Sequence, residues 1–190
     1  MLSISALIHD FAANFRRFFY RIRDKCGKSR KQLDIDQLRD FVDVHSLEPE
    51  DEKTPYIVAH TIEDLQECED GQRFYINILI SSKTLINRIL KDPTDKVIMI
   101  DTTHGLSVDR LLLCLTGTTN SSHEFCPIAL SLTTNENTRS AAEVLQWVKD
   151  RHEGEVQAVM ADGALCLSSA ISAVFGDSVT RLMCLSHMMR

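Results

Sequence analysis

The order of apolar segments in the second half of the sequence restricts the fold more than any other feature. Strand-like runs with short polar connections are followed by two helix-plus-strand pairs, in the order 96–101, 110–117, 126–133, helix 139–151, 156–161, helix 165–175 and 180–184. Short connections make consecutive strands antiparallel, whereas a strand reached through a helix runs parallel to its neighbour. The sequence therefore predicts an α/β fold whose mixed sheet has three antiparallel strands followed by αβαβ. A further strand-like run at 73–80 and a short helix at 84–91 precede this unit.

An aspartate ends each of two of these runs. Asp101 closes the first strand and Asp162 closes the fourth. Because crossovers are right-handed, the fourth strand is expected to dock parallel to the first, on the side away from the second. The two aspartates would then lie side by side at the carboxyl ends of neighbouring strands, where open α/β sheets place their sites.

Two interpretations of these aspartates follow from the residues alone. Adjacent carboxylates repel each other unless a cation neutralises them, and Mg²⁺ prefers hard oxygen ligands. Alternatively, Asp162 caps the following helix and Asp101 belongs to a turn with Thr102 and Thr103. His104 has the better claim among the nearby histidines through its nearness to Asp101, but its position in a loop favours a solvated histidine over a ligand.

The last strand leads into Cys184 and His187, which have half the spacing of a zinc site. The alternative is a buried cysteine at a strand end. The six cysteines are scattered, which favours reduced thiols and a nuclear or cytoplasmic protein over a secreted one. No stretch is apolar enough to cross a membrane, and no signal peptide is evident.

The N-terminal region differs from the rest in charge and pattern. Residues 1–54 are expected to form a basic helical appendage that ends in an acidic linker at 46–54, with helices over 8–24 and 34–44. Although the net charge is −6, basic side chains are concentrated in one segment, which contains Arg16, Arg17, Arg21, Arg23, Lys25, Lys28, Arg30 and Lys31. This segment is the candidate for contacts with the DNA backbone, whose affinity would depend strongly on salt. A solvated helix face explains the same charges.

From about residue 74 to His187 the chain resembles the core of Mutator-like (MULE) transposases of the ribonuclease H-like DDE/DDD group. The resemblance rests on a series of short motifs in one order: the strand at 74–80 and the helix after it, Ile100-Asp101-Thr102-Thr103-His104-Gly105, Pro127-Ile128-Ala129-Leu130 with Thr133-Thr134-Asn135-Glu136, Trp147, Met160-Ala161-Asp162-Gly163-Ala164, and Cys184-x-x-His187. Residues 55–190 would be a partial transposase domain.

The resemblance implies a ribonuclease H-like sheet and metal-assisted cleavage and transfer of DNA strands. Asp101 and Asp162 would bind Mg²⁺ or Mn²⁺ as the first two catalytic acids, with DNA as partner and a homo-oligomer as the assembly of intact members. Glu136 matches a recurring family residue but not the third acid, which lies on a helix beyond the motif of Cys184 and His187. The core is thus expected to be incomplete at the C-terminus, with little strand cleavage by this chain alone. The alternative function is a non-catalytic DNA-binding or interaction module derived from a transposable element.

Overall fold

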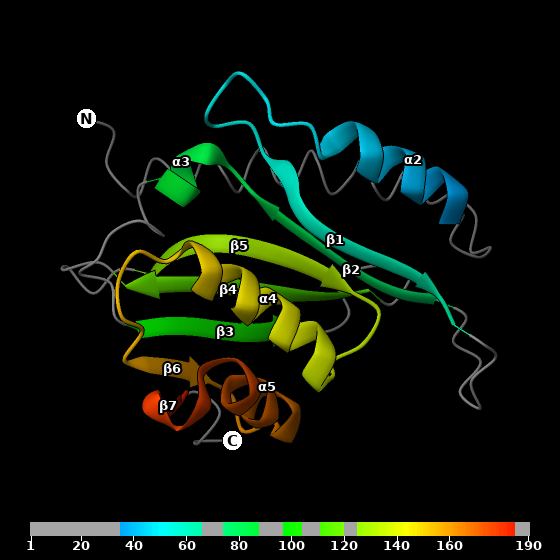
Figure 1. The fold of residues 1–190 in the computed structure, drawn as a ribbon. Coiled ribbons are helices and arrows are strands. Elements are labelled where there is room, and N and C mark those ends of the chain that lie inside the picture. The colour runs from blue at the N-terminus through cyan, green and yellow to red at the C-terminus, as the bar shows by residue number, and fades with distance from the viewer. Residues whose placement is uncertain (1–34, 66–73, 88–96, 104–110, 120–124, 185–190) are drawn as a thin grey trace.

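The protein is represented by a computed structural model that describes residues 35–65, 74–87, 97–103, 111–119 and 125–184. These residues form one seven-stranded sheet with helices on both faces (Figure 1). The strands are β1 (Tyr56–Asp64), β2 (Phe74–Ser81), β3 (Val97–Thr103), β4 (Leu112–Thr119), β5 (Phe125–Thr133), β6 (Ala158–Ala161) and β7 (Thr180–Met183). The expected helix over 8–24 and the basic segment lie outside the described residues.

The strand order is β1-β2-β5-β4-β3-β6-β7. All pairs from β1 to β3 across the sheet are antiparallel, whereas β3 with β6 and β6 with β7 are parallel. The predicted mixed α/β sheet is therefore confirmed, including the parallel position of β6 beside β3 and away from β4. β7 lies at the edge of the sheet.

The described helices are α2 (Ile35–His45), the short α3 (Lys83–Leu85), α4 (Thr138–Arg151) and α5 (Leu165–Phe175), with a 3₁₀ turn η2 (Gly176–Ser178). Of these, α2, α4 and α5 begin and end close to the predicted positions, whereas α3 ends well before residue 91, and residues 88–91 lie outside the described part of the chain. Asn137 caps α4 through a capping box with Ser140, which satisfies main-chain N–H groups that have no partner within the helix. α5 ends at Gly176, whose φ of 67° suits a residue without a Cβ.

Two apolar clusters fix the helices to opposite faces of the sheet. One face packs against α4 and α5 through residues that include Leu79, Ile98 and Ile128. The other face packs against α2 through Ile76, Ile78 and Ile80, which alternate with the first set along β2. Since β2 is buried on both faces, it is an interior strand with an almost continuous apolar sequence. No helix among the described residues is long and apolar enough to span a membrane.

A buried amide joins the sheet to α4. Asn77 on β2 is 4% exposed, and its Nδ2 donates to the carbonyl of Ser140 (3.2 Å) and to Glu143 Oε2 (2.8 Å). Its Oδ1 accepts a hydrogen bond of 2.7 Å from Ser131 on β5. The phenol of Tyr75 donates to the same Glu143 oxygen at 3.0 Å. These bonds satisfy a polar group inside an apolar layer and set the position of α4 over the sheet.

Candidate functional site

The two aspartates lie at the same level of two adjacent parallel strands. Met99 of β3 and Met160 of β6 are Cα partners in the parallel register. Asp101 lies two residues beyond the first, and Asp162 lies two residues beyond the second, just after β6, so the two positions are at the same level of the sheet. Asp101 does not end its strand, and its interpretation as a turn residue is wrong, because Thr102 and Thr103 continue β3 and pair with β4. Asp101 is exposed and follows the buried Ile100, which faces α4 and α5. Its side chain therefore extends on the opposite face.

Asp162 has a defined local structure just after β6. Its Oδ1 accepts a hydrogen bond of 2.8 Å from the main-chain N–H of Ala164, which closes an Asx turn. Arg181 on β7 donates to the Asp162 carbonyl at 2.7 Å. The N-cap of α5 is Ala164, which makes no side-chain capping bond. The interpretation of Asp162 as the helix cap is therefore wrong, although its role in a turn is correct.

A third carboxylate, Glu136, lies near β3 and β4, where it lines a small pocket with Thr102 and Cys114. Burial is the main cause that raises the pKa of Cys114 on β4 to about 12, and the negative charges of Asp101 and Glu136 raise it further. The pKa of Cys166 on α5 is also raised, first by burial and then by the charges of Glu136 and Asp162. Glu136 shares a small pocket with Cys114 and Leu167 on the face covered by α4 and α5, whereas the Asp101 side chain extends on the other face. The motif Thr133-Thr134-Asn135-Glu136 singled out Glu136 in the sequence, but the spacing of the residues gave no reason to expect it beside Cys114.

The raised pKa of Cys114 has a consequence for its reactivity. The thiolate is the nucleophilic form, and Cys114 is 5% exposed, so we expect it to resist alkylation by iodoacetamide at about pH 8 in the folded protein. Cys166 is only half-buried and should be labelled faster. Mass spectrometry of peptides after timed labelling measures both, and denatured protein serves as the control in which the two react alike. Equal labelling in the folded protein would contradict the described burial.

The remaining predicted site residues are only partly described. Cys184 follows β7, is half-buried, and donates its main-chain N–H to the carbonyl of Ala161 at 2.9 Å. His187 and His104 lie outside the described residues, as do the eight basic residues of the segment 16–31. The pairing of Cys184 with His187 at zinc therefore stays a prediction.

Asp101 and Asp162 are the candidate oxygen ligands for a divalent cation. Within the described ranges, no three His, Cys, Asp or Glu side chains are close enough to hold a metal ion together. Asp101 and Asp162 nevertheless offer hard oxygen donors at one edge, and the exposure of Asp101 leaves room for water. Mg²⁺ is typically bound through one or two carboxylates and retains several waters. The two aspartates fit that mode of binding.

Part of the chain matches a known protein family. The family model of the MULE transposase domain matches residues 97–190, from the start of β3 onward. No curated protein matches the chain. The matched segment contains Asp101, Glu136 and Asp162, together with strands β3 to β7 and helices α4 and α5. Residues 97–190 therefore belong to the MULE transposase domain family, which supports a transposase-type function for this chain.

Proposed function

We propose that the edge formed by β3 and β6 is a metal-dependent site for cleavage and transfer of DNA strands, with Asp101 and Asp162 as its metal-binding acids. The observation that carries the proposal is the common register of the two aspartates on parallel strands within the transposase domain. The order β5-β4-β3-β6-β7, with its antiparallel and parallel halves, also supports a relation to the ribonuclease H-like group.

The residues would have distinct roles at this site. A divalent cation supplies Lewis-acid stabilisation of the charge that develops on a phosphodiester. Asp101 presents an exposed carboxylate from a strand whose neighbours on both sides hold it in place. The Ala164 N–H fixes Oδ1 of Asp162, which orients this carboxylate before any cation or DNA arrives. Among the described residues, Oδ2 of Asp162 has no hydrogen-bond partner and is the oxygen left for coordination.

Direct measurement of Mn²⁺ binding tests the metal assignment without relying on activity. Titration calorimetry or the electron paramagnetic resonance signal of free Mn²⁺ should show one class of sites in the full chain. We expect Asp101→Asn and Asp162→Asn each to weaken Mn²⁺ binding by about tenfold or more, since each removes a charged oxygen ligand. Asp177→Asn is the matched control, because Asp177 is an exposed acid in η2. If Asp177→Asn weakened Mn²⁺ binding while Asp101→Asn and Asp162→Asn left it unchanged, the assignment would be refuted.

The chemistry is tested separately with DNA. If the chain nicks plasmid DNA in Mn²⁺, Asp101→Asn and Asp162→Asn should abolish the nicking. Cleavage that persists unchanged in both variants would place the site elsewhere. The circular dichroism spectrum of each variant should match that of the unmodified chain, because Asp101 is exposed and the Asx-turn oxygen is retained in Asp162→Asn.

A further inference from the structure

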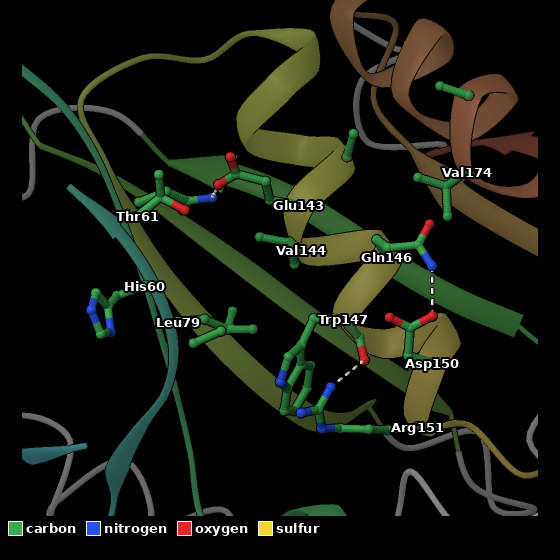
Figure 2. Close-up of a pocket in the computed structure, with 14 residues that line it drawn as sticks. His60, Thr61, Leu79, Glu143, Val144, Gln146, Trp147, Asp150, Arg151 and Val174 are labelled. Atoms are coloured by element: carbon green, nitrogen blue, oxygen red, sulfur yellow. Dashed lines mark hydrogen bonds between the residues drawn. The ribbon is translucent and has the colours of Figure 1, made fainter. Parts of the chain in front are cut away.

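A pocket of about 550 Å³ lies between the C-terminal half of α4 and the strands β1 and β2. Its apolar lining includes Leu79 from β2, Val144 and Trp147 from α4, and Val174 from α5. In Figure 2, Leu79, Val144 and Trp147 lie on the side of α4 that faces β1, whereas Val174 lies on the side that faces α5. The lining includes neither Asp101 nor Asp162, so the pocket is separate from the proposed metal site. Its volume is within the range of ordinary ligand pockets.

The main chain of β1 forms part of the pocket wall. Three consecutive residues, Ala59, His60 and Thr61, line the pocket, although neighbouring side chains on a strand point to opposite faces. Consecutive residues of a strand can line one pocket where the main chain of the strand, and not only its side chains, borders the pocket. Within the described part of the sheet, β1 pairs with β2 alone and forms the edge opposite β7. The open N–H and C=O groups of an edge strand are a template for an added strand.

The accessible length of this edge is short. A bulge interrupts the pairing of β1 between Ile57 and Ala59. At the other end, Glu63 is bound by Arg139 (2.6 Å) and Asp64 by Arg39 (3.1 Å). Charged residues and bulges at these positions limit pairing along the rest of the strand. The window at 59–62 therefore admits a few residues of extended chain and not a long intermolecular strand.

A buried donor without a partner points into the same pocket. Trp147 is 5% exposed, and among the residues that the structure describes its Nε1 has no hydrogen-bond partner. In Figure 2 the indole nitrogen is turned towards the side on which Leu79 and His60 lie. A buried indole N–H normally finds an acceptor. Arg151 lies over the indole ring at 4.8 Å and is held to the Trp147 carbonyl by a 3.4 Å bond, so an acceptor reaches Nε1 once this exposed side chain turns outward.

The charges around the pocket favour a basic occupant. The charged residues of the lining include the acids Glu143 and Asp150 and the base Arg151. Glu143 is paired with Arg139 at 3.1 Å, but Arg139 is shared with Glu63. Asp150 also lines the pocket and accepts a hydrogen bond of 2.6 Å from Gln146, but within the described ranges it has no ion-pair partner. An occupant that carries a positive charge near Asp150 would complement this end of the pocket.

We propose that this pocket binds a short extended peptide that adds a strand to the edge of β1. One aliphatic side chain of the peptide fills the space between Leu79 and Val144, a main-chain carbonyl accepts from Trp147 Nε1, and a basic residue lies near Asp150. Added strands take their affinity from main-chain hydrogen bonds and their specificity from pockets for alternate side chains. The peptide class is thus a segment with an aliphatic and a basic residue, which partner proteins of a transposase-type chain can supply.

The test uses a phage-displayed library of random peptides of about seven residues against the full chain. Selected peptides should share an aliphatic and a basic residue, and a synthetic copy should shift the indole N–H resonance of Trp147. That resonance is unique because the chain has a single tryptophan. Methylation of alternate main-chain nitrogens of the peptide should weaken binding by about tenfold or more, because it removes donors to the strand edge.

Matched variants separate the pocket from the surrounding surface. Ala173→Phe should fill the pocket from α5 and abolish peptide binding, whereas Ser172→Phe, at the neighbouring exposed position outside the lining, should leave it unchanged. Asp150→Asn should remove the preference for a basic residue. A library that yields no binder sensitive to Ala173→Phe would overturn the proposal. Equal binding of the methylated peptide would also overturn it, in favour of a small apolar ligand.

Discussion

Asn77→Leu is expected to lower the free energy of unfolding by about 3 kcal/mol, since it leaves several buried polar groups without partners. The leucine has a similar volume, so no cavity forms. The Ser131 hydroxyl is 1% exposed and loses its acceptor, while Glu143 and the Ser140 carbonyl each lose a donor. Urea unfolding followed by circular dichroism measures the change. A loss below about 1 kcal/mol would show that water replaces the amide.

Two further variants identify the cause of this loss. Gln146→Leu removes an amide from the exposed side of α4 and should change stability by less than about 0.5 kcal/mol. Asn77→Asp keeps an acceptor for Ser131 but places a second carboxylate against Glu143. Repulsion raises the pKa of the new acid above its unfolded value. Its stability should therefore be higher at low pH and should fall as pH rises through that pKa.

Gly117→Ala is the second substitution with a large expected effect. An added Cβ would come within 2.5 Å of the Cys126 carbonyl oxygen and would also overlap the Phe125 ring. The ring can move, but the carbonyl belongs to the paired strand β5 at a bulge in the β4–β5 register. We expect the backbone to shift at a cost of about 2–3 kcal/mol in unfolding free energy. Thermal denaturation with a matched urea titration measures it.

Gly163→Ala is the matched control for this substitution. A Cβ at Gly163 meets nothing within 4 Å. Alanine also reduces the conformational freedom of the unfolded chain, so this variant should be as stable as the unmodified protein or slightly more stable. If both variants lost stability alike, the effect would come from glycine replacement in general and not from the close approach of β5.

Much of the fold follows from local pattern and chain topology. The helix predicted over 165–175 has the same bounds as α5, and the strand at 126–133 begins within one residue of β5. The handedness of crossovers was enough to place β6 beside β3. That placement alone brings Asp101 and Asp162 to the same level of adjacent strands, so the position of the candidate site was the most predictable part of the molecule.

Other features depend on contacts that no local pattern contains. The sequence did not identify β1, whose half-exposed residues give a weak alternation, and it gave no partner for the strand at 74–80. Asn77 reads as a polar interruption of that strand, yet its partners come from β5 and α4 far along the chain. Glu136 similarly lies beside Thr102 and Cys114, in a loop that ends at the α4 cap Asn137.

The position of β2 inside the sheet has a consequence for the order of folding during synthesis. β2 is made before β3 and β4, but its interior partner is β5, with Asn77 opposite Thr133. Until β5 has left the ribosome, one side of an almost wholly apolar strand has no hydrogen-bond partner of its own. Distant pairing of this kind slows folding and leaves nascent chains prone to aggregation. Nascent chains that end before residue 125 should therefore depend strongly on chaperones, and longer ones should be released from them.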